Sequence, residues 1–312
     1  MSEMKPATHA PAMASDEARG FFSPTAKRRW QNFKANRRGY WSFWIFLVIF
    51  GLSLCAELVA NDRPILAFYK GELLVPVLVD YPEEQFGGFL ARTDYRDPFI
   101  YEEIEANGWM LWPPIRYSYR TANSYIPTSA PTAPFWTMTV EERCAAYPKG
   151  ADDPGCIIGN MNWLGTDDQA RDVMARMIYG FRISVLFGLV LTSLSAVVGV
   201  SMGAVQGYFG GWTDLLFQRM IEIWSSMPVL YILLIIAAIL PPGFWILLSI
   251  MLLFSWVSFV GIVRAEFLRA RNFEYVNAAR ALGVGNATII YRHLLPNAMV
   301  ATLTFLPFIL SG

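Results

Sequence analysis

The chain has 312 residues, of which 54% are apolar and 16% are charged, whereas ordinary soluble domains are about 25% charged. Equal numbers of basic and acidic side chains, twenty-five of each, give no indication of a nucleic acid or an acidic substrate as partner. Two histidines and three cysteines are too few for a histidine-rich metal site, a zinc ribbon or a disulfide scaffold. The composition predicts an integral membrane protein that contacts lipid and no nucleic acid, with no metal or cofactor of its own.

The charges are distributed unevenly along the chain. Residues 1–39 carry eight basic and three acidic side chains, whereas residues 61–170 carry sixteen acidic and eight basic ones. Lys and Arg accumulate on the cytoplasmic side of membrane proteins. We therefore expect 1–39 to be a cytoplasmic tail and the acidic segment to lie on the outside.

Residues 40–60 are predicted to form the first membrane span, with Glu57 at its outer end. The external insertion follows at 61–182. Eleven of the chain's nineteen prolines lie within residues 61–170, so the insertion is predicted to be rich in loops. One short strand is expected at Leu73–Val79. The insertion is either a docking surface or lid, or a filler loop whose aromatic side chains lie at the membrane interface.

The insertion is predicted to end in an amphipathic helix that begins at a capping box, Thr166–Gln169. The second span follows at 183–207. Its glycines Gly199, Gly203 and Gly207 are four residues apart, a spacing that lets two membrane helices pack closely. Gly199–Gly203 also matches the G-x-S-x-G motif of esterases, but that motif requires a strand-to-helix turn with a histidine within reach. A membrane hydrolase is therefore a distant alternative.

The third and fourth spans are predicted at 216–240 and 244–263, separated by Pro241-Pro242-Gly243. A cytoplasmic loop, 264–296, carries five arginines and two glutamates. Residues 297–312 would start a fifth span, and we expect the chain to continue to a sixth helix. The spans contain few ionisable groups, so a partner is expected to supply the energy. The alternative is a secondary transporter or channel subunit that needs no ATPase.

The cytoplasmic loop contains a predicted helix–turn–helix. One face of its first helix is formed by Tyr275, Ala278, Ala279 and Leu282. Gly283 is expected to end this helix, Asn286 to cap the next one and Pro296 to end it before the membrane. Small side chains on one face suit a helix that binds in a groove on another protein. The alternative is a structured loop that packs only on its own bundle.

Two stretches resemble a known family. Bacterial ABC importer permeases share a coupling-loop pattern matched by Asn277, Ala278, Ala279, Gly283, His293, Leu295 and Pro296. Here Asn277 replaces an acidic residue and His293 replaces an isoleucine. The signature of the oligopeptide/dipeptide branch is similar to the residues Gly165, Thr166, Asp167, Arg171, Asp172 and Arg182, with Ala170 where that pattern has glycine. Arg37–Asp62, Asn107–Arg116 and Arg264–Gly283 resemble the permeases of Yej-type importers of peptides and microcin C.

The resemblance implies an all-α membrane protein, a polytopic helical bundle of the type I ABC importer permease kind with a loop-rich periplasmic insertion. It implies a bacterial inner-membrane protein that imports peptides and has no catalysis of its own. The implied partners are a second permease subunit, a periplasmic binding protein and an ABC ATPase whose two nucleotide-binding domains hold ATP and Mg. It assigns ATPase coupling to Tyr275, Asn277, Ala278, Ala279, Leu282, Gly283, His293 and Pro296.

The three cysteines divide between two environments. Cys144 and Cys156 lie in the predicted periplasmic insertion, an oxidising compartment, and are expected to form a disulfide across a short loop. Cys55 is expected to be an inert thiol in the first span.

Overall fold

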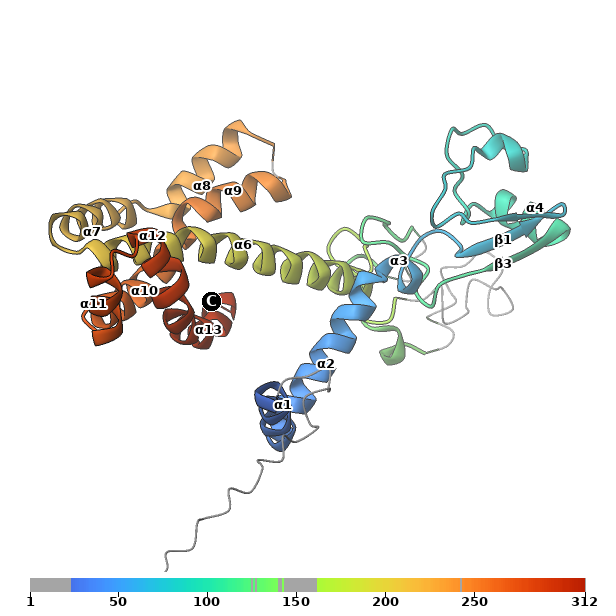
Figure 1. The fold of residues 1–312 in the computed structure, drawn as a ribbon. Helices are drawn as coiled ribbons and strands as arrows, with labels where there is room; N and C mark the ends of the chain where they lie inside the picture. The colour runs from blue at the N-terminus through green and yellow to red at the C-terminus, as the bar shows by residue number, and fades with distance from the viewer. Residues whose placement is uncertain are drawn as a thin grey trace, which may run out of the picture.

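The computed structural model describes residues 24–124, 126, 128–139, 142, 162–241 and 243–311. It contains a helical bundle and a small unit formed by the predicted external insertion, which is called the external unit after that prediction. Helix α6 (Val173–Phe209) connects them: its first residues lie beside the external unit and its last residues lie in the bundle (Figure 1). Cys144, Cys156, Pro242 and the first 23 residues of the predicted tail lie outside the described residues.

The helix in the predicted first span, 40–60, ends at Leu54. Helix α1 (Pro24–Ala35) is followed by α2 (Arg37–Leu54), and the side chain of Asn36 between them accepts a hydrogen bond from the backbone of Gly39. The predicted span 40–60 is interrupted because Cys55 leaves the helical conformation, and a single turn, α3 (Ala56–Val59), follows it. Cys55 is an exposed free thiol at this break.

The external unit is built on a small antiparallel sheet. Strands β1 (Leu66–Tyr69), β2 (Glu72–Leu74) and β3 (Gly108–Leu111) lie in the order β2-β1-β3. Lys70 and Gly71 both have positive φ, which is the backbone geometry of a tight two-residue hairpin turn. The short helix η2 (Glu83–Phe86) and helix α4 (Pro98–Asn107) pack their apolar side chains on this sheet. The turn η3 (Phe135–Thr137) lies further along the insertion.

The predicted strand Leu73–Val79 is therefore wrong beyond Leu74. Val75 accepts backbone hydrogen bonds from Leu78 and Val79, so the chain turns there instead of extending. Leu78 and Val79, the last residues of the apolar run, are exposed on the surface of the unit and belong to no strand. A run of apolar residues alone cannot distinguish a strand from such a loop.

Helix α6 has 37 residues, roughly 55 Å at the α-helical rise. The predicted amphipathic helix and the predicted second span, 183–207, are two parts of this one helix. Gly180 is the only helix breaker near their junction, and glycine alone lowers helix stability without ending a helix.

The predicted third span, 216–240, is two helices. Helix α7 (Gly211–Ser225) and α8 (Val229–Ile239) meet at a bend of 62°. Pro228 lies at this break, where its ring cannot continue the hydrogen bonding of the helix before it. Helix α9 (Phe244–Ser255) then starts where the fourth span is predicted, but its continuation α10 (Val257–Ala270) ends seven residues later than residue 263.

The segment between α10 and α13 is shorter than the predicted loop 264–296, because α10 extends to Ala270. It contains α11 (Glu274–Ala281) and α12 (Asn286–Thr288), and then the π-helical turn η7 (Ile289–Leu294) runs directly into α13 (Leu295–Ser311). Pro296 was predicted to end the second piece, but it lies in the first turn of α13. A π turn relaxes the local hydrogen bonding, which lets the helix pass through a proline.

Three helices among the described residues are long and apolar enough to cross a membrane: Val173–Phe209, Phe244–Ala270 and Asn286–Ser311. The bent pair α7 and α8 gives a fourth if it is one span. Helix α2 does not meet the same standard of length and composition, since its first turn contains Arg37 and Arg38.

Candidate functional site

Helix α11 has one buried and one exposed face. Val276 and Ala279 are buried in the core formed by α6, α10 and η7, at 0% and 8% exposure. Ala278 is exposed, and Leu282, which follows the helix, is 83% exposed. The predicted face therefore divides: Ala279 anchors the helix to its own bundle, and Ala278 and Leu282 remain accessible.

The end of α11 is fixed by a glycine cap. Gly283 has φ +76, and the N–H of Val284 donates to the carbonyl of Ala279 while that of Gly283 donates to Arg280. This pair of bonds is the Schellman arrangement, which satisfies the last free carbonyls of a helix. Only glycine adopts this conformation without a steric penalty. Gly283 thus ends α11, as its position in the sequence predicts.

Polar contacts tie α11 and the turn after it to α6. The hydroxyl of Tyr208, near the end of α6, donates to Oδ1 of Asn286 at 2.6 Å. The guanidinium of Arg280 lies over the ring of Tyr208, 4.9 Å from its centroid. The prediction that Asn286 caps the next helix is wrong, because its side chain makes this contact instead and Gly285 occupies the cap position.

The remaining predicted coupling residues lie around this helix. The hydroxyl of Tyr275 accepts a hydrogen bond at 3.3 Å from Nδ2 of Asn297 in α13. Asn277 is exposed and donates to the backbone of Asn272. His293 is half-buried in η7 and Pro296 is exposed in α13. Tyr275 thus joins Ala279 in fixing α11 to the bundle, while Asn277 lies on the accessible side.

The three glycines of α6 pack against α10. A Cβ atom at Gly199 would lie 2.3 Å from the carbonyl oxygen of Trp256, and one at Gly203 would lie 2.8 Å from that of Val260. At Gly207 it would lie 2.5 Å from Cβ of Phe267. The two backbones are close enough that a methyl group cannot enter. This contact positions α10, which leads directly into α11.

A polar cluster lies at the other end of α6, where Asp172 caps the helix. Its buried carboxylate accepts a hydrogen bond at 2.7 Å from the backbone of Ala175 and another at 2.8 Å from Nδ2 of Asn162. Burial raises the pKa of Asp172. The predicted capping box at Thr166–Gln169 is wrong, because the hydroxyl of Thr166 pairs with that of Thr132.

Asp167 organises the turn before this cap. Its carboxylate accepts backbone hydrogen bonds from Gln169 and Arg171 and pairs with the guanidinium groups of Arg171 and Arg176. Burial opposes ionisation, but these hydrogen bonds outweigh it and lower the pKa of Asp167 to about 2. Ala170 has φ +57 in this turn, a left-handed conformation in which a side chain is strained. That strain is a physical reason for glycine in the family pattern at this position.

Further contacts join α6 to the short helix α3 and its cap residue Ala60. Arg182 binds both carboxylate oxygens of Glu57, at 2.9 and 3.0 Å. The hydroxyl of Tyr179 donates to the carbonyl of Ala60 at 2.9 Å. The signature residues at this end are therefore occupied by contacts within the chain. Gly165, also in the signature, has φ +78 and lies against the backbone of Thr132.

The esterase-like motif has no hydrolase geometry. Ser201 lies in the middle of α6, and its hydroxyl donates to the carbonyl of Val197 at 2.7 Å. It does not lie on a strand-to-helix turn, the arrangement that exposes the nucleophile of such enzymes.

Several apolar helices joined to a short helix that ends in a glycine cap define a multi-pass membrane protein of the transport-permease class. Residues 172–312 match the family model of the binding-protein-dependent transport system inner membrane component. The chain is 81% identical over 294 residues to the peptidoglycan transport system permease protein YejE of Agrobacterium fabrum, an alignment that covers 94% of this chain and 77% of that relative.

Two further relatives place the chain more narrowly. It is 52% identical over 291 residues to the inner membrane ABC transporter permease protein YejE of Escherichia coli, covering 93% of this chain and 78% of the relative. It is 34% identical over 138 residues to the oligopeptide transport system permease protein OppC of Bacillus subtilis, covering 44% and 45%. The chain belongs to the family of ABC transporter inner-membrane permeases, in its YejE-type branch. It is a multi-pass transport component that acts with other subunits, and it is not an enzyme.

Proposed function

We propose that this chain is one permease half of an ATP-driven importer of peptides or peptide-like compounds, including cargo of the microcin C type. In this proposal α11 docks on an ABC ATPase with two nucleotide-binding domains, which binds the ATP and Mg. A second permease subunit completes the pore, and a periplasmic binding protein delivers the cargo. The amino terminus and α11 lie in the cytoplasm, in keeping with the arginine-rich loop around α11.

The observation that carries the proposal is the division of α11 into two faces. Val276 and Ala279 fix it to the bundle, and Gly283 ends it sharply. Its outer side, with Ala278 and Leu282, is free to contact another protein. A short rigid helix with small and apolar exposed residues suits a groove on a partner. Movement of the ATPase would then reach α10 and α6 through the same buried contacts.

The cargo is inferred from the relatives. The Agrobacterium fabrum relative is named for peptidoglycan transport and the Bacillus subtilis relative for oligopeptide transport. Peptides are the chemistry that these two names share, since peptidoglycan contains peptide chains. The spans of the described structure carry few charged side chains, so energy from an ATPase is a better explanation than coupling to an ion gradient.

The test is a large side chain on the exposed face of α11. Ala278→Trp should leave the protein folded in the membrane but abolish co-purification of the ATPase and peptide uptake, because packed interfaces tolerate little added volume. Ala91→Trp adds the same volume at an exposed alanine of the external insertion and should change neither. Wild-type docking and uptake by Ala278→Trp would contradict the proposal.

Ala279→Trp separates anchoring from docking. Ala279 lies in the core of this chain, so the indole has no space and the thermal stability of the purified permease should fall. Ala278→Trp should keep the wild-type unfolding temperature. If both variants unfolded at the same lowered temperature, the loss of docking would be explained by misfolding and the proposed contact would be wrong.

A further inference from the structure

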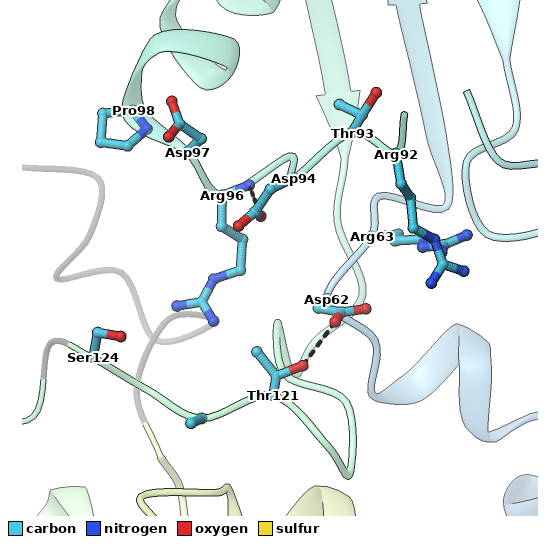
Figure 2. Close-up of a pocket in the computed structure, with 11 residues that line it drawn as sticks. Asp62, Arg63, Arg92, Thr93, Asp94, Arg96, Asp97, Pro98, Thr121 and Ser124 are labelled. Atoms are coloured by element: carbon cyan, nitrogen blue, oxygen red, sulfur yellow. Dashed lines mark hydrogen bonds between the residues drawn. The ribbon is translucent and has the colours of Figure 1, made fainter. Parts of the chain in front are cut away.

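A pocket of about 400 Å³ lies in the predicted external insertion, between the segment that follows α3 and the loop that leads into α4. Figure 2 shows Arg96 extending into it from one side and Arg63 and Arg92 on the opposite side, with Asp62 and Thr121 between them. Its volume is at the small end of small-molecule sites, roughly 300–1,000 Å³. It therefore suits a ligand of a few residues and not a folded partner.

Two of the lining charges are oriented by neutral groups. The carboxylate of Asp62 accepts a hydrogen bond at 2.7 Å from the hydroxyl of Thr121. The guanidinium of Arg96 lies over the ring of the buried Tyr117, 4.2 Å from its centroid. Within the described part of the chain, no ion pair neutralises either Asp62 or Arg96. Each side chain is held in place while its charge stays available.

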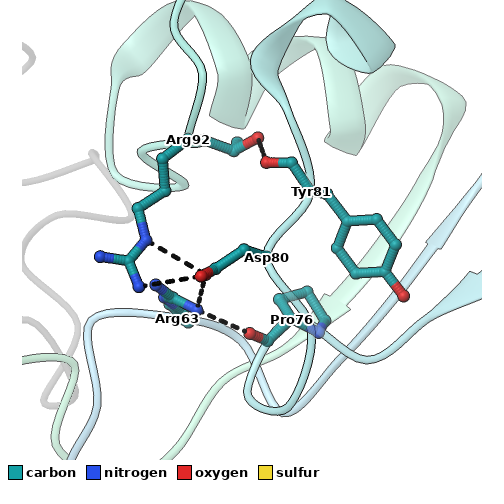
Figure 3. A network of polar contacts seen from close by, with 6 residues as sticks. Arg63, Pro76, Asp80, Tyr81 and Arg92 are labelled. Carbon is teal, nitrogen blue, oxygen red and sulfur yellow. Dashed lines mark hydrogen bonds and ion pairs between the residues drawn. The ribbon is translucent and has the colours of Figure 1, made fainter.

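The opposite wall carries an excess of positive charge. Arg92 binds both carboxylate oxygens of Asp80 at 3.1 Å, and Arg63 pairs with the same carboxylate and donates to the carbonyl of Pro76 at 3.3 Å (Figure 3). Hydrogen bonds from Arg92 and the nearby charge of Arg63 lower the pKa of Asp80. One carboxylate thus lies between two guanidinium groups, and one positive charge remains.

We propose that this pocket binds a zwitterion, an amino acid or peptide of two or three residues with a free ammonium and a free carboxylate. The ammonium group binds Asp62, and the carboxylate binds Arg96. The hydroxyl of Ser124, which also lines the pocket, is suited to the peptide groups between them. The hydroxyl of Thr93 donates to the carbonyl of Tyr81 and can only accept from a peptide N–H.

Other small ligands fit less well. Asp94 and Asp97 line the pocket together with Asp62, so a phosphate or another simple anion would be repelled. The three arginines repel a simple cation. The described residues contain no group of three or more acidic, histidine or cysteine side chains that could hold a metal ion. A ligand that carries both signs of charge matches both kinds of wall.

The experiment measures binding of trialanine to the purified full-length permease in lipid nanodiscs. Two derivatives each lack one charge: N-acetyl-trialanine has no ammonium group, and trialanine amide has no carboxylate. We expect each derivative to bind at least about tenfold more weakly than trialanine, the usual effect of losing a hydrogen bond between charged groups.

Two variants assign the contacts. Arg96→Gln should weaken trialanine binding at least about tenfold and should no longer distinguish trialanine from its amide. Asp62→Asn should also weaken trialanine binding at least about tenfold, and it should no longer distinguish trialanine from N-acetyl-trialanine. Arg120→Gln is the matched control, since Arg120 also lies over a tyrosine ring, that of Tyr119, but does not line the pocket. It should bind like the wild type.

Three outcomes would overturn the proposal: no binding of trialanine, equal binding of all three peptides, or wild-type binding by both pocket variants. Arg96→Lys guards against a folding defect, since it keeps the positive charge and should bind more tightly than Arg96→Gln. The site is independent of ATPase docking at α11. Ala278→Trp should therefore bind trialanine normally, which distinguishes failure of this site from failure of the proposed function.

Discussion

The two ends of α6 are held in different ways. At the end beside the external unit, which is called the outer end after the predicted topology, polar contacts dominate: Asp172 caps the helix, and Arg182 and Tyr179 bind the short helix α3 and its cap. At the other end, which is called the inner end after the predicted topology, Gly199, Gly203 and Gly207 bring the backbone of α6 against α10. There Tyr208 adds a hydrogen bond to Asn286. The outer signature residues are satisfied within the chain, whereas α11 at the inner end keeps an exposed face. We infer that the outer motif maintains the fold and the inner motif contacts another subunit.

The largest effect should come from a methyl group at the inner end. Gly199→Ala places Cβ against the carbonyl of Trp256, where nothing flexible can move aside. We expect a loss of about 2–3 kcal/mol of unfolding free energy, as for overpacked cores. Gly180→Ala, in the outer half of the same helix, meets no atom within 4 Å and should stabilise the helix by up to about 1 kcal/mol. Thermal unfolding of the two purified variants measures the difference, and equal shifts would contradict the contrast between the halves.

Loss of the outer cap should have a somewhat smaller effect. Asp172→Ala removes the acceptor of the backbone N–H of Ala175 and of the side-chain Nδ2 of Asn162. The expected cost is about 2 kcal/mol. Asp168→Ala removes an exposed carboxylate four residues earlier and should be near neutral. The expected readout is faster proteolysis of the 162–176 segment in Asp172→Ala alone, and the same protection in both variants would show that the cap is dispensable.

The outer cluster should also respond to acid. The pKa of Asp167 is about 2 in the folded protein, below its ordinary value of 3.8. Its stabilisation is therefore fully present above about pH 4 and is lost as the pH falls through 2. At pH 6, wild type should be more stable than Asp167→Asn by about 2 kcal/mol. In thermal unfolding experiments, this difference in stability should become smaller below pH 4. A difference that did not change with pH would show that the charge of Asp167 does not cause the stabilisation.

The smallest effect should be a gain. Ala170 is strained at φ +57, and Ala170→Gly removes the clash of its Cβ atom with the backbone. We expect about 1 kcal/mol of added stability, the usual penalty of a left-handed residue that is not glycine. Ala122→Gly, in a part of the insertion without positive φ, should not stabilise the protein. A destabilised Ala170→Gly variant would mean that chain flexibility outweighs the strain.

Sequence patterns predict the inner end of α6 better than the outer end. Glycines at a spacing of four lie on one face of any helix, so Gly199, Gly203 and Gly207 indicate close packing without further information. The cap is harder to predict because Thr166 and Asp172 are both good cap residues, and only the buried partner Asn162 selects Asp172. Asn162 is ten residues away in the sequence, beyond the range of any local pattern.

The other errors have similar causes. The bend at Pro228 lies inside the predicted third span, 216–240, because the sequence pattern divides the long apolar run only at Pro241-Pro242-Gly243. The hairpin at Lys70–Gly71 has a recognisable turn, but its strands are too short to show alternation. On α11 the periodicity grouped Ala279 with Ala278, although Val276 shows which side is buried. Choosing between two amphipathic faces required the position of α6.

The central claim is that the accessible side of α11 contacts another subunit while its buried side anchors it. The most direct measurement is photocrosslinking in the assembled transporter, with a photoreactive amino acid at Leu282, which is 83% exposed. The account predicts a crosslink to the ATPase from this position and none from the same group at Phe89, an exposed residue of the external insertion. No ATPase crosslink from position 282, or equal crosslinking from position 89, would contradict it.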